Sequence, residues 1–229
     1  MCGRYTLRSV IPETLAQALQ IEKMPELGAQ HNIAPTQMVV AVLHDSKSNK
    51  HELQRLRWGL IPSWAKDPAI GAKLINARAE TVAKKPAFCF AFKHQRCLIL
   101  ADGFYEWKQE NGKKQPFYFR LQNGEIFGFA GLWEVWESPQ TGQIKSCTIL
   151  TTQANDLVQP LHDRMPVILA LQDWDVWLNS QVQKPELLQQ LLRPYPPAEM
   201  TGYAVSTLVN NPKHNSPECV APLSAGNDR

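Results

Sequence analysis

The chain has 229 residues, 44% of them hydrophobic, and a formal net charge of +3 from 24 lysine and arginine residues against 21 aspartate and glutamate residues. This length and apolar content allow a substantial core in one large or two small domains, and so mild a charge does not by itself indicate a nucleic-acid partner. No stretch of roughly 18 apolar residues occurs and no signal or transit peptide is recognisable, which excludes a membrane-spanning helix and leads us to expect a cytoplasmic protein.

Alternating apolar and β-branched residues predict many strands and few helices. The predicted strands are residues 38–43, 53–58, 96–101, 117–121, 126–133, 145–151, 167–169 and 202–205. The predicted helices are residues 12–19, 85–93, 173–178 and 185–192. Two aromatic segments, 104–107 and 116–119, flank a predicted hairpin turn at Asn111-Gly112. Because short connections join successive strands, we expect an α+β fold with a largely antiparallel, curved or barrel-like sheet and flanking short helices.

Composition also bears on domain organisation and metal binding. Nothing between residues 2 and 205 resembles a linker, so residues 1–223 are expected to form a single domain, and residues 224–229 are predicted to be a disordered tail. The five cysteines are odd in number, and without a secretory signal they indicate reduced thiols. Cys89, His94 and Cys97 resemble part of a zinc site, but no second pair completes four ligands, so no metal site is predicted.

The beginning of the chain, Met1-Cys2-Gly3-Arg4, carries the most informative chemistry. A residue as small as Cys2 in second place is normally exposed by removal of the initiator methionine, which leaves cysteine at the N-terminus. Its amine, with a pKa of roughly 7.7–8.0, and its thiol, with a pKa of about 8.5, are both nucleophilic near neutral pH. Together they can close a thiazolidine ring on an aldehyde. The alternative is a chance residue on a frayed end.

Other segments contain candidate catalytic residues whose roles the residues alone leave open. Glu106 lies between two aromatic residues, where desolvation would raise the pKa of its carboxyl group and suit it to proton transfer, but it equally fits an outward-facing strand position. His162 lies in a loop beside an acidic and a basic residue, and it fits either acid–base catalysis or a surface histidine. Asn76 and Arg78 would share a face of an extended segment. They could be functional, with Asn76 orienting an amine or a carbonyl group and Arg78 binding a phosphate, or they could be structural, as a turn amide and a surface arginine in an ion pair.

Six strings of residues occur in order along the chain. They are Met1-Cys2-Gly3-Arg4, Asn32-Ile33-Ala34-Pro35, Trp58-Gly59-Leu60-Ile61-Pro62-Ser63-Trp64, Ile75-Asn76-Ala77-Arg78-Ala79-Glu80-Thr81, Ala101-Asp102-Gly103-Phe104-Tyr105-Glu106-Trp107 and Leu161-His162-Asp163-Arg164-Met165-Pro166. Together they resemble the SOS-response-associated peptidase (SRAP) family, whose members capture abasic sites in single-stranded DNA. The resemblance covers Cys2 to about Leu223, and six strings in this order are highly specific.

The resemblance implies a reaction for the N-terminal cysteine. An abasic site exists partly as a ring-opened aldehyde, so the amine of Cys2 would form a Schiff base and its thiol would close a thiazolidine, leaving a covalent DNA–protein crosslink. Asn76 matches the asparagine that orients the amine and the opened sugar, Glu106 the carboxylate that transfers protons, and His162 the histidine that acts on the sugar hydroxyl. A Schiff base also permits weak lyase activity by β-elimination. The mechanism needs no metal or organic cofactor.

The resemblance also implies DNA contacts. Arg4, Arg78 and Arg164 match phosphate-binding arginines, Trp64 offers a flat face to a base beside the lesion, and Asn32 is expected to join them. A few arginines converging on one groove would bind a backbone although the whole chain carries only +3. The alternative for Trp64 is core packing.

Two other functions are weighed against capture of abasic sites. Cys2 could be the nucleophile of a peptidase or amidase, with its own amine or His162 as the base, and in the narrow form of this reaction the protein would remove its own Met1. The chain could also be a non-covalent single-strand binding module. Single-stranded DNA containing abasic sites is the expected partner, in the response to DNA damage, and a monomer is the default state.

Overall fold

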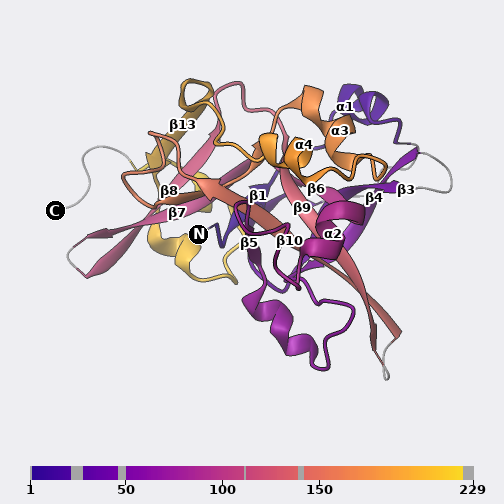
Figure 1. The fold of residues 1–229 in the computed structure, drawn as a ribbon. Coiled ribbons are helices and arrows are strands. Elements are labelled where there is room, and N and C mark those ends of the chain that lie inside the picture. The colour runs from indigo at the N-terminus through magenta and orange to yellow at the C-terminus, as the bar shows by residue number, and fades with distance from the viewer. Residues whose placement is uncertain (1, 22–27, 46–49, 111, 139–141, 224–229) are drawn as a thin grey trace.

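The computed structural model describes residues 2–21, 28–45, 50–110, 112–138 and 142–223, and Figure 1 shows their arrangement. The strands of this part of the chain are β1 (Tyr5–Leu7), β2 (Gln30–Ile33), β3 (Met38–Asp45), β4 (Lys50–Trp58), β5 (Asn76–Arg78), β6 (Arg96–Ala101), β7 (Gly103–Glu110), β8 (Lys113–Leu121), β9 (Phe127–Ser138), β10 (Gly142–Gln153), β11 (Arg164–Pro166), β12 (Ile168–Leu169) and β13 (Met200–Ala204). The helices are α1 (Glu13–Ala18), α2 (Cys89–His94), α3 (Trp174–Leu178) and α4 (Pro185–Gln190), with 3-10 turns η1 (Pro68–Lys73), η2 (Leu171–Asp173), η3 (Pro197–Glu199), η4 (Thr207–Asn210) and η5 (Pro217–Val220). No helix in these residues combines the length and apolar character that crossing a membrane requires.

Five strands close into a barrel in the order β10-β4-β3-β6-β9, because β10 pairs with β4 on one side and with β9 on the other. The barrel pairs are antiparallel except β10–β4, and β5 continues the parallel pairing along β10. The central strand β6 is buried along its whole length, which agrees with its nearly unbroken apolar sequence. The predicted α+β fold with a largely antiparallel, barrel-like sheet is confirmed.

A second sheet, in the order β13-β8-β7-β1-β2, packs against the barrel through aromatic side chains. The ring of Tyr5 in β1 lies 5.4 Å from that of Trp58 in β4 and 5.6 Å from that of Phe129 in β9, measured between centroids. Edge-to-face contacts of this kind add to the free energy of burying the rings. β7 and β8 form the predicted hairpin, although Asn111 of its turn lies outside the described residues. The first strand of the chain is therefore part of the second sheet and packs against the barrel through Tyr5.

The structure differs from the sequence-based prediction mainly in its short elements. β1, β2 and β5 are not predicted, because three or four residues are too few to show an alternating pattern. They form because neighbouring strands supply hydrogen-bond partners: β1 lies between β2 and β7, and β5 lies beside β10. The helix predicted at residues 85–93 begins only at Cys89, since Pro86 disfavours a helical conformation at Lys85. The tail predicted at residues 224–229 lies outside the described residues.

A strained turn precedes β3. Thr36 has φ +74°, which a β-branched residue rarely adopts, and it follows Pro35 in a turn where Gln37 N donates to Ala34 O at 3.3 Å. Glycine is the residue that a type II turn favours at this place. Because Thr36 is exposed, Thr36→Gly should relieve strain without losing packing, and we expect the free energy of unfolding to rise by about 1 kcal/mol.

Thermal or denaturant unfolding measures this change. Thr36→Ala is the matched control, since alanine removes the β-branch but keeps a Cβ at positive φ, and it should be stabilised less. A lower unfolding midpoint for Thr36→Gly than for the parent protein would contradict the assignment of strain to this turn.

Candidate functional site

Cys2 is fully buried at the junction of the two sheets. The pairing of β1 with β7 continues beyond the strand, since Tyr105 N donates to Arg4 O at 3.0 Å, and this carries Cys2 along β7. From the other side Asn76, the first residue of β5, donates its Nδ2 to Cys2 O at 2.8 Å. Figure 1 shows the beginning of the chain in the middle of the molecule, near the labels of β7 and β5. The frayed-end alternative for Cys2 is therefore wrong.

The thiol of Cys2 titrates far from neutral pH. Burial raises its pKa from 9.0 to about 12, and the charge of Glu106 adds to this rise, while the charged amine at the start of the chain and a hydrogen bond with the backbone of Arg4 oppose it. In the chain that carries Met1, the pKa of this buried thiol therefore lies above the value of about 8.5 that is usual for a free thiol. Since the thiol stays protonated at neutral pH, a reaction through its sulfur requires a base that accepts its proton.

Two polar side chains, Glu106 and Asn76, flank Cys2. Glu106 is 4% exposed, and its Oε1 accepts a hydrogen bond from Trp107 N at 3.2 Å, so the outward-facing alternative for this residue is wrong. The Oδ1 atom of Asn76 is buried without a hydrogen-bond partner in the described chain, while the Nδ2 of the same amide binds Cys2 O. A buried oxygen left in this state costs free energy. Asn76 can therefore accept a hydrogen bond from a group that arrives beside Cys2.

Arg4 and Asn32 are held by the C-terminal segment. Arg4 Nη1 donates to Asn32 Oδ1 and to Val209 O, both at 2.8 Å. Asn32 Nδ2 donates to the carbonyl oxygens of Val209, Asn211 and His214 at 3.2, 3.0 and 2.7 Å. Asn32 is buried, and partial burial lowers the pKa of the Arg4 guanidinium. These contacts join the first and last parts of the described chain and leave only part of Arg4 for a ligand.

His162 and Arg164 belong to a second polar group. Arg164 donates from Nη1 and Nη2 to the two carboxylate oxygens of Glu80 at 2.7 and 2.9 Å, which lowers the pKa of Glu80, and from Nη2 to Thr151 O at 2.6 Å. His162 Nδ1 lies 2.9 Å from both Arg164 N and Asp163 Oδ1. One nitrogen cannot accept from the first and donate to the second at once. We assign Nδ1 as the acceptor, because the backbone N–H is always a donor.

Strand β10 connects the two groups. Its parallel pairing with β5 places Asn76 opposite Ile149 and Arg78 opposite Thr151. Its antiparallel pairing with β11 places Thr151 opposite Pro166 and brings Arg164 alongside the same stretch. The structure therefore brings Cys2, Asn76 and Glu106 together, and it places Arg78, His162 and Arg164 farther along β10.

The predicted DNA contacts differ in exposure. Trp64 is 61% exposed, so core packing, the alternative for this side chain, is wrong. Arg78 is exposed as well, and Arg4 is partly so. Asn32 and Arg164 are buried and engaged in the internal hydrogen bonds described above. Trp64 and Arg78 are thus the exposed members of the set.

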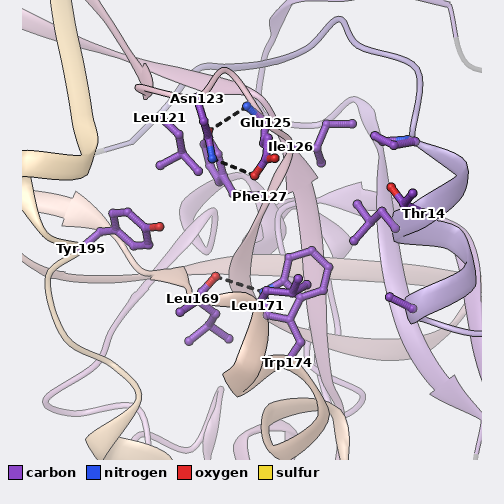
Figure 2. A pocket seen from close by; sticks show the side chains of 14 residues that line it. Thr14, Leu121, Asn123, Glu125, Ile126, Phe127, Leu169, Leu171, Trp174 and Tyr195 are labelled. Carbon is purple, nitrogen blue, oxygen red and sulfur yellow. Dashed lines mark hydrogen bonds between the residues drawn. The ribbon is translucent and has the colours of Figure 1, made fainter.

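Figure 2 shows a pocket elsewhere in the molecule, with a volume of about 260 Å³. It is lined by α1, by the turn between β8 and β9, by residues 169–171 and by the side chains of Trp174 and Tyr195. None of the predicted site residues lines it. Among the described residues, no three His, Cys, Asp or Glu side chains are grouped so that they could hold a metal ion.

The fold and site define an α+β barrel protein that buries the second residue of its chain beside an amide and a carboxylate, and comparisons identify its family. The family model described as SOS response associated peptidase (SRAP) matches residues 1–212. The chain is 46% identical over 224 residues to the abasic site processing protein YoqW of Bacillus subtilis (strain 168), covering 96% of this chain and 99% of that protein. This chain therefore belongs to the SRAP family, as the six strings of residues predicted.

More distant relatives support the same family and fold. The abasic site processing protein HMCES of Xenopus tropicalis is 35% identical over 206 residues, covering 78% of this chain and 60% of that protein. A crystal structure of a protein from Bacteroides thetaiotaomicron superposes with a TM-score of 0.85 at 25% identity, covering 97% of this chain and all of that one. The fold and the family assignment thus rest on independent comparisons.

Several residues around the site are not singled out by the sequence. Glu80 binds Arg164 in a bidentate pair, and a glutamate two residues after Arg78 could have suggested an ion pair. Val209 and Asn211 contribute backbone carbonyl oxygens, which any residue type carries and which leave no signal in a sequence. The supports of Trp64, described below, are also unpredicted.

Proposed function

We propose that this protein captures abasic sites in single-stranded DNA as a covalent crosslink through Cys2, after removal of Met1. Relatives at 46% and 35% identity are named abasic site processing proteins, and this supports DNA with abasic sites as the substrate. The observation that carries the proposal is the burial of Cys2 between Asn76 and Glu106, an environment suited to a reactive group rather than to a loose end.

The reaction proceeds in two steps that balance without an oxidant. The amine of Cys2 adds to the aldehyde carbon of the opened sugar, and loss of water gives a Schiff base. The sulfur then adds to the carbon of the C=N bond, the thiol proton is transferred to the nitrogen, and a thiazolidine results. Because the thiol is protonated at neutral pH, the second step needs a group that moves this proton, and Glu106 is assigned that role.

The surrounding residues receive roles that fit their contacts. Asn76 orients the amine through its buried Oδ1, and His162 acts on the sugar hydroxyl. Trp64 and Arg78, both exposed, make the direct DNA contacts by stacking on a base and pairing with a phosphate. Arg4 has two roles: one side of its guanidinium binds Asn32 and Val209 within the protein, and the rest contacts a phosphate of the DNA.

Asn32 and Arg164 position other residues rather than meeting DNA directly. Asn32 fixes Arg4, and the pair of Arg164 with Glu80 fixes the loop that carries His162. A weak lyase activity follows from the Schiff base. The protein acts as a monomer in the DNA damage response.

Intact-mass spectrometry and a denaturing gel test the proposal. The protein is analysed alone and after incubation with single-stranded DNA that contains one abasic site. We expect a mature mass without Met1 and an adduct that survives denaturation and forms without a reductant. Retention of Met1 would contradict the crosslinking proposal, and hydrolysis of a test peptide with no adduct would favour the peptidase alternative. Binding without any adduct would favour a non-covalent module.

A further inference from the structure

The loop that presents Trp64 leaves the barrel abruptly. Gly59, directly after β4, has φ +123°, and a Cβ built on it would lie 2.6 Å from Gly71 O. Only glycine allows this turn and this close approach of two backbones. From there residues 60–65 run beside the β9–β10 hairpin and form hydrogen bonds with both of its strands.

The hairpin binds this loop at every second residue. Three hydrogen bonds run from Ile61 N to Ser146 Oγ at 2.8 Å, from Ser63 N to Glu134 Oε2 at 3.1 Å, and from Trp136 Nε1 to Ala65 O at 2.7 Å. Ser146 and Glu134 are directly opposite in the β9–β10 pairing, and Trp136 follows two residues later on the same face of β9. Both neighbours of Trp64 in the chain are therefore held by the hairpin, while Trp64 itself is exposed.

A small hydrophobic cluster lies behind these hydrogen bonds. Ile61, Ala65 and Trp136 are buried together, and Ile70 and Ile144 pack against them. This cluster is separate from the main core of the barrel. The inner side of the loop is therefore packed, and the backbone on both sides of the exposed tryptophan is anchored to the hairpin.

Glu134 is an unusual residue for such a place. It is 4% exposed, and burial raises the pKa of its carboxyl group while hydrogen bonds from Ser63 oppose the rise. A buried carboxylate lowers stability unless hydrogen bonds compensate for the lost water. Here the compensation comes from the backbone and side chain of the residue that immediately precedes Trp64.

We propose that Glu134 is a positioning residue that holds Trp64 ready to stack on a base beside the abasic site, with Trp136 and Ser146 as its helpers. The inference rests on the DNA-binding role proposed for Trp64. A ring held in place before binding loses less conformational freedom when the base arrives, which increases affinity. Glu134 acts on DNA only through Trp64.

The test measures the rate of adduct formation against the concentration of single-stranded DNA with one abasic site. Glu134→Ala removes the acceptor of Ser63 N and should raise the half-saturating DNA concentration about tenfold, as Trp64→Ala should, because stacking of one base contributes on the order of tenfold in affinity. The variants should change this half-saturating concentration and leave the maximal rate of adduct formation unchanged. Glu134→Gln keeps an acceptor oxygen and should behave like the parent protein.

The double variant Trp64→Ala with Glu134→Ala decides whether Glu134 works through the tryptophan. If it does, the double variant is no weaker than Trp64→Ala alone, within about twofold. Trp136→Phe keeps an aromatic ring in the cluster but loses the donor to Ala65 O and part of the packed indole, so it should weaken binding about threefold. It provides the same test if Glu134→Ala fails to fold.

Two outcomes would overturn the inference. If the effects of Trp64→Ala and Glu134→Ala multiply in the double variant, Glu134 acts independently of the tryptophan. If Trp64→Ala leaves the half-saturating concentration unchanged, the stacking role of Trp64 fails and the inference fails with it. The covalent reaction is judged separately in the same experiment, because the adduct is visible on the gel whatever its concentration dependence.

Discussion

Cys2→Ala should abolish the adduct that survives denaturation, with at least a hundredfold loss in yield, on the order expected when a nucleophile is removed. Alanine keeps the N-terminal amine, so it can still form a Schiff base, but it has no sulfur to close the ring. Cys2→Ser should give only a labile adduct, because a hydroxyl does not form the stable sulfur-containing ring. Denaturing gels with and without a reductant distinguish a Schiff base, which reduction traps, from a thiazolidine.

Cys89→Ala is the matched control for this prediction. Cys89 lies at the start of α2, is only partly buried and makes a weak contact with Pro86 O at 3.9 Å, so its loss should leave the adduct unchanged. An adduct that forms at the parent rate in Cys2→Ala would overturn the proposed chemistry. Peptide hydrolysis that survives in Cys2→Ser but not in Cys2→Ala would point to the hydrolase alternative instead.

Glu106→Gln should slow formation of the adduct by about a hundredfold to ten-thousandfold, the range typical of general acid–base catalysis. Glutamine has nearly the same volume and can still accept the hydrogen bond from Trp107 N, but it cannot take the proton of a thiol whose pKa is about 12. The final adduct should nonetheless be stable, since the ring itself does not involve Glu106. Single-turnover kinetics followed by gel or mass spectrometry measure the rate.

The control is Glu134→Gln, which makes the same substitution at an equally buried glutamate, 4% exposed, on the β9–β10 hairpin. It should form the adduct at the parent rate when DNA is saturating. A Glu106→Gln variant that reacts as fast as this control would show that another group moves the proton. Circular dichroism and thermal unfolding of both variants exclude loss of the fold as the cause.

The sequence allows much of the barrel and part of the site to be predicted. The long apolar strands β3, β6 and β9 are found because their residues alternate or are continuously apolar over six or more positions. Cys2, Asn76 and Glu106 are each recognised in a separate string of residues, and the structure brings them together. Candidate residues whose side chains have distinctive chemistry could therefore be selected from the sequence before the fold was known.

The features of the site that the sequence does not reveal depend on contacts between segments far apart in the chain. The parallel pairing of β5 with β10, which places Asn76 beside Cys2, involves a three-residue strand without a pattern of its own. The burial that raises the pKa of the Cys2 thiol to about 12 arises only when both sheets close around it. The burial of Asn32 and of Arg164 likewise reflects partners that neither local sequence indicates.

The contact of Arg4 with Val209 O, between residues 205 positions apart, has a consequence for the order of events during synthesis. At about 5–20 residues per second, the ribosome completes this stretch in roughly 10–40 seconds. Throughout that interval the contacts of Arg4 with the C-terminal segment cannot form, and the first residues of the chain are not yet locked. If Met1 is removed as proposed, an external aminopeptidase would have access to it during this interval, before the finished protein encloses Cys2.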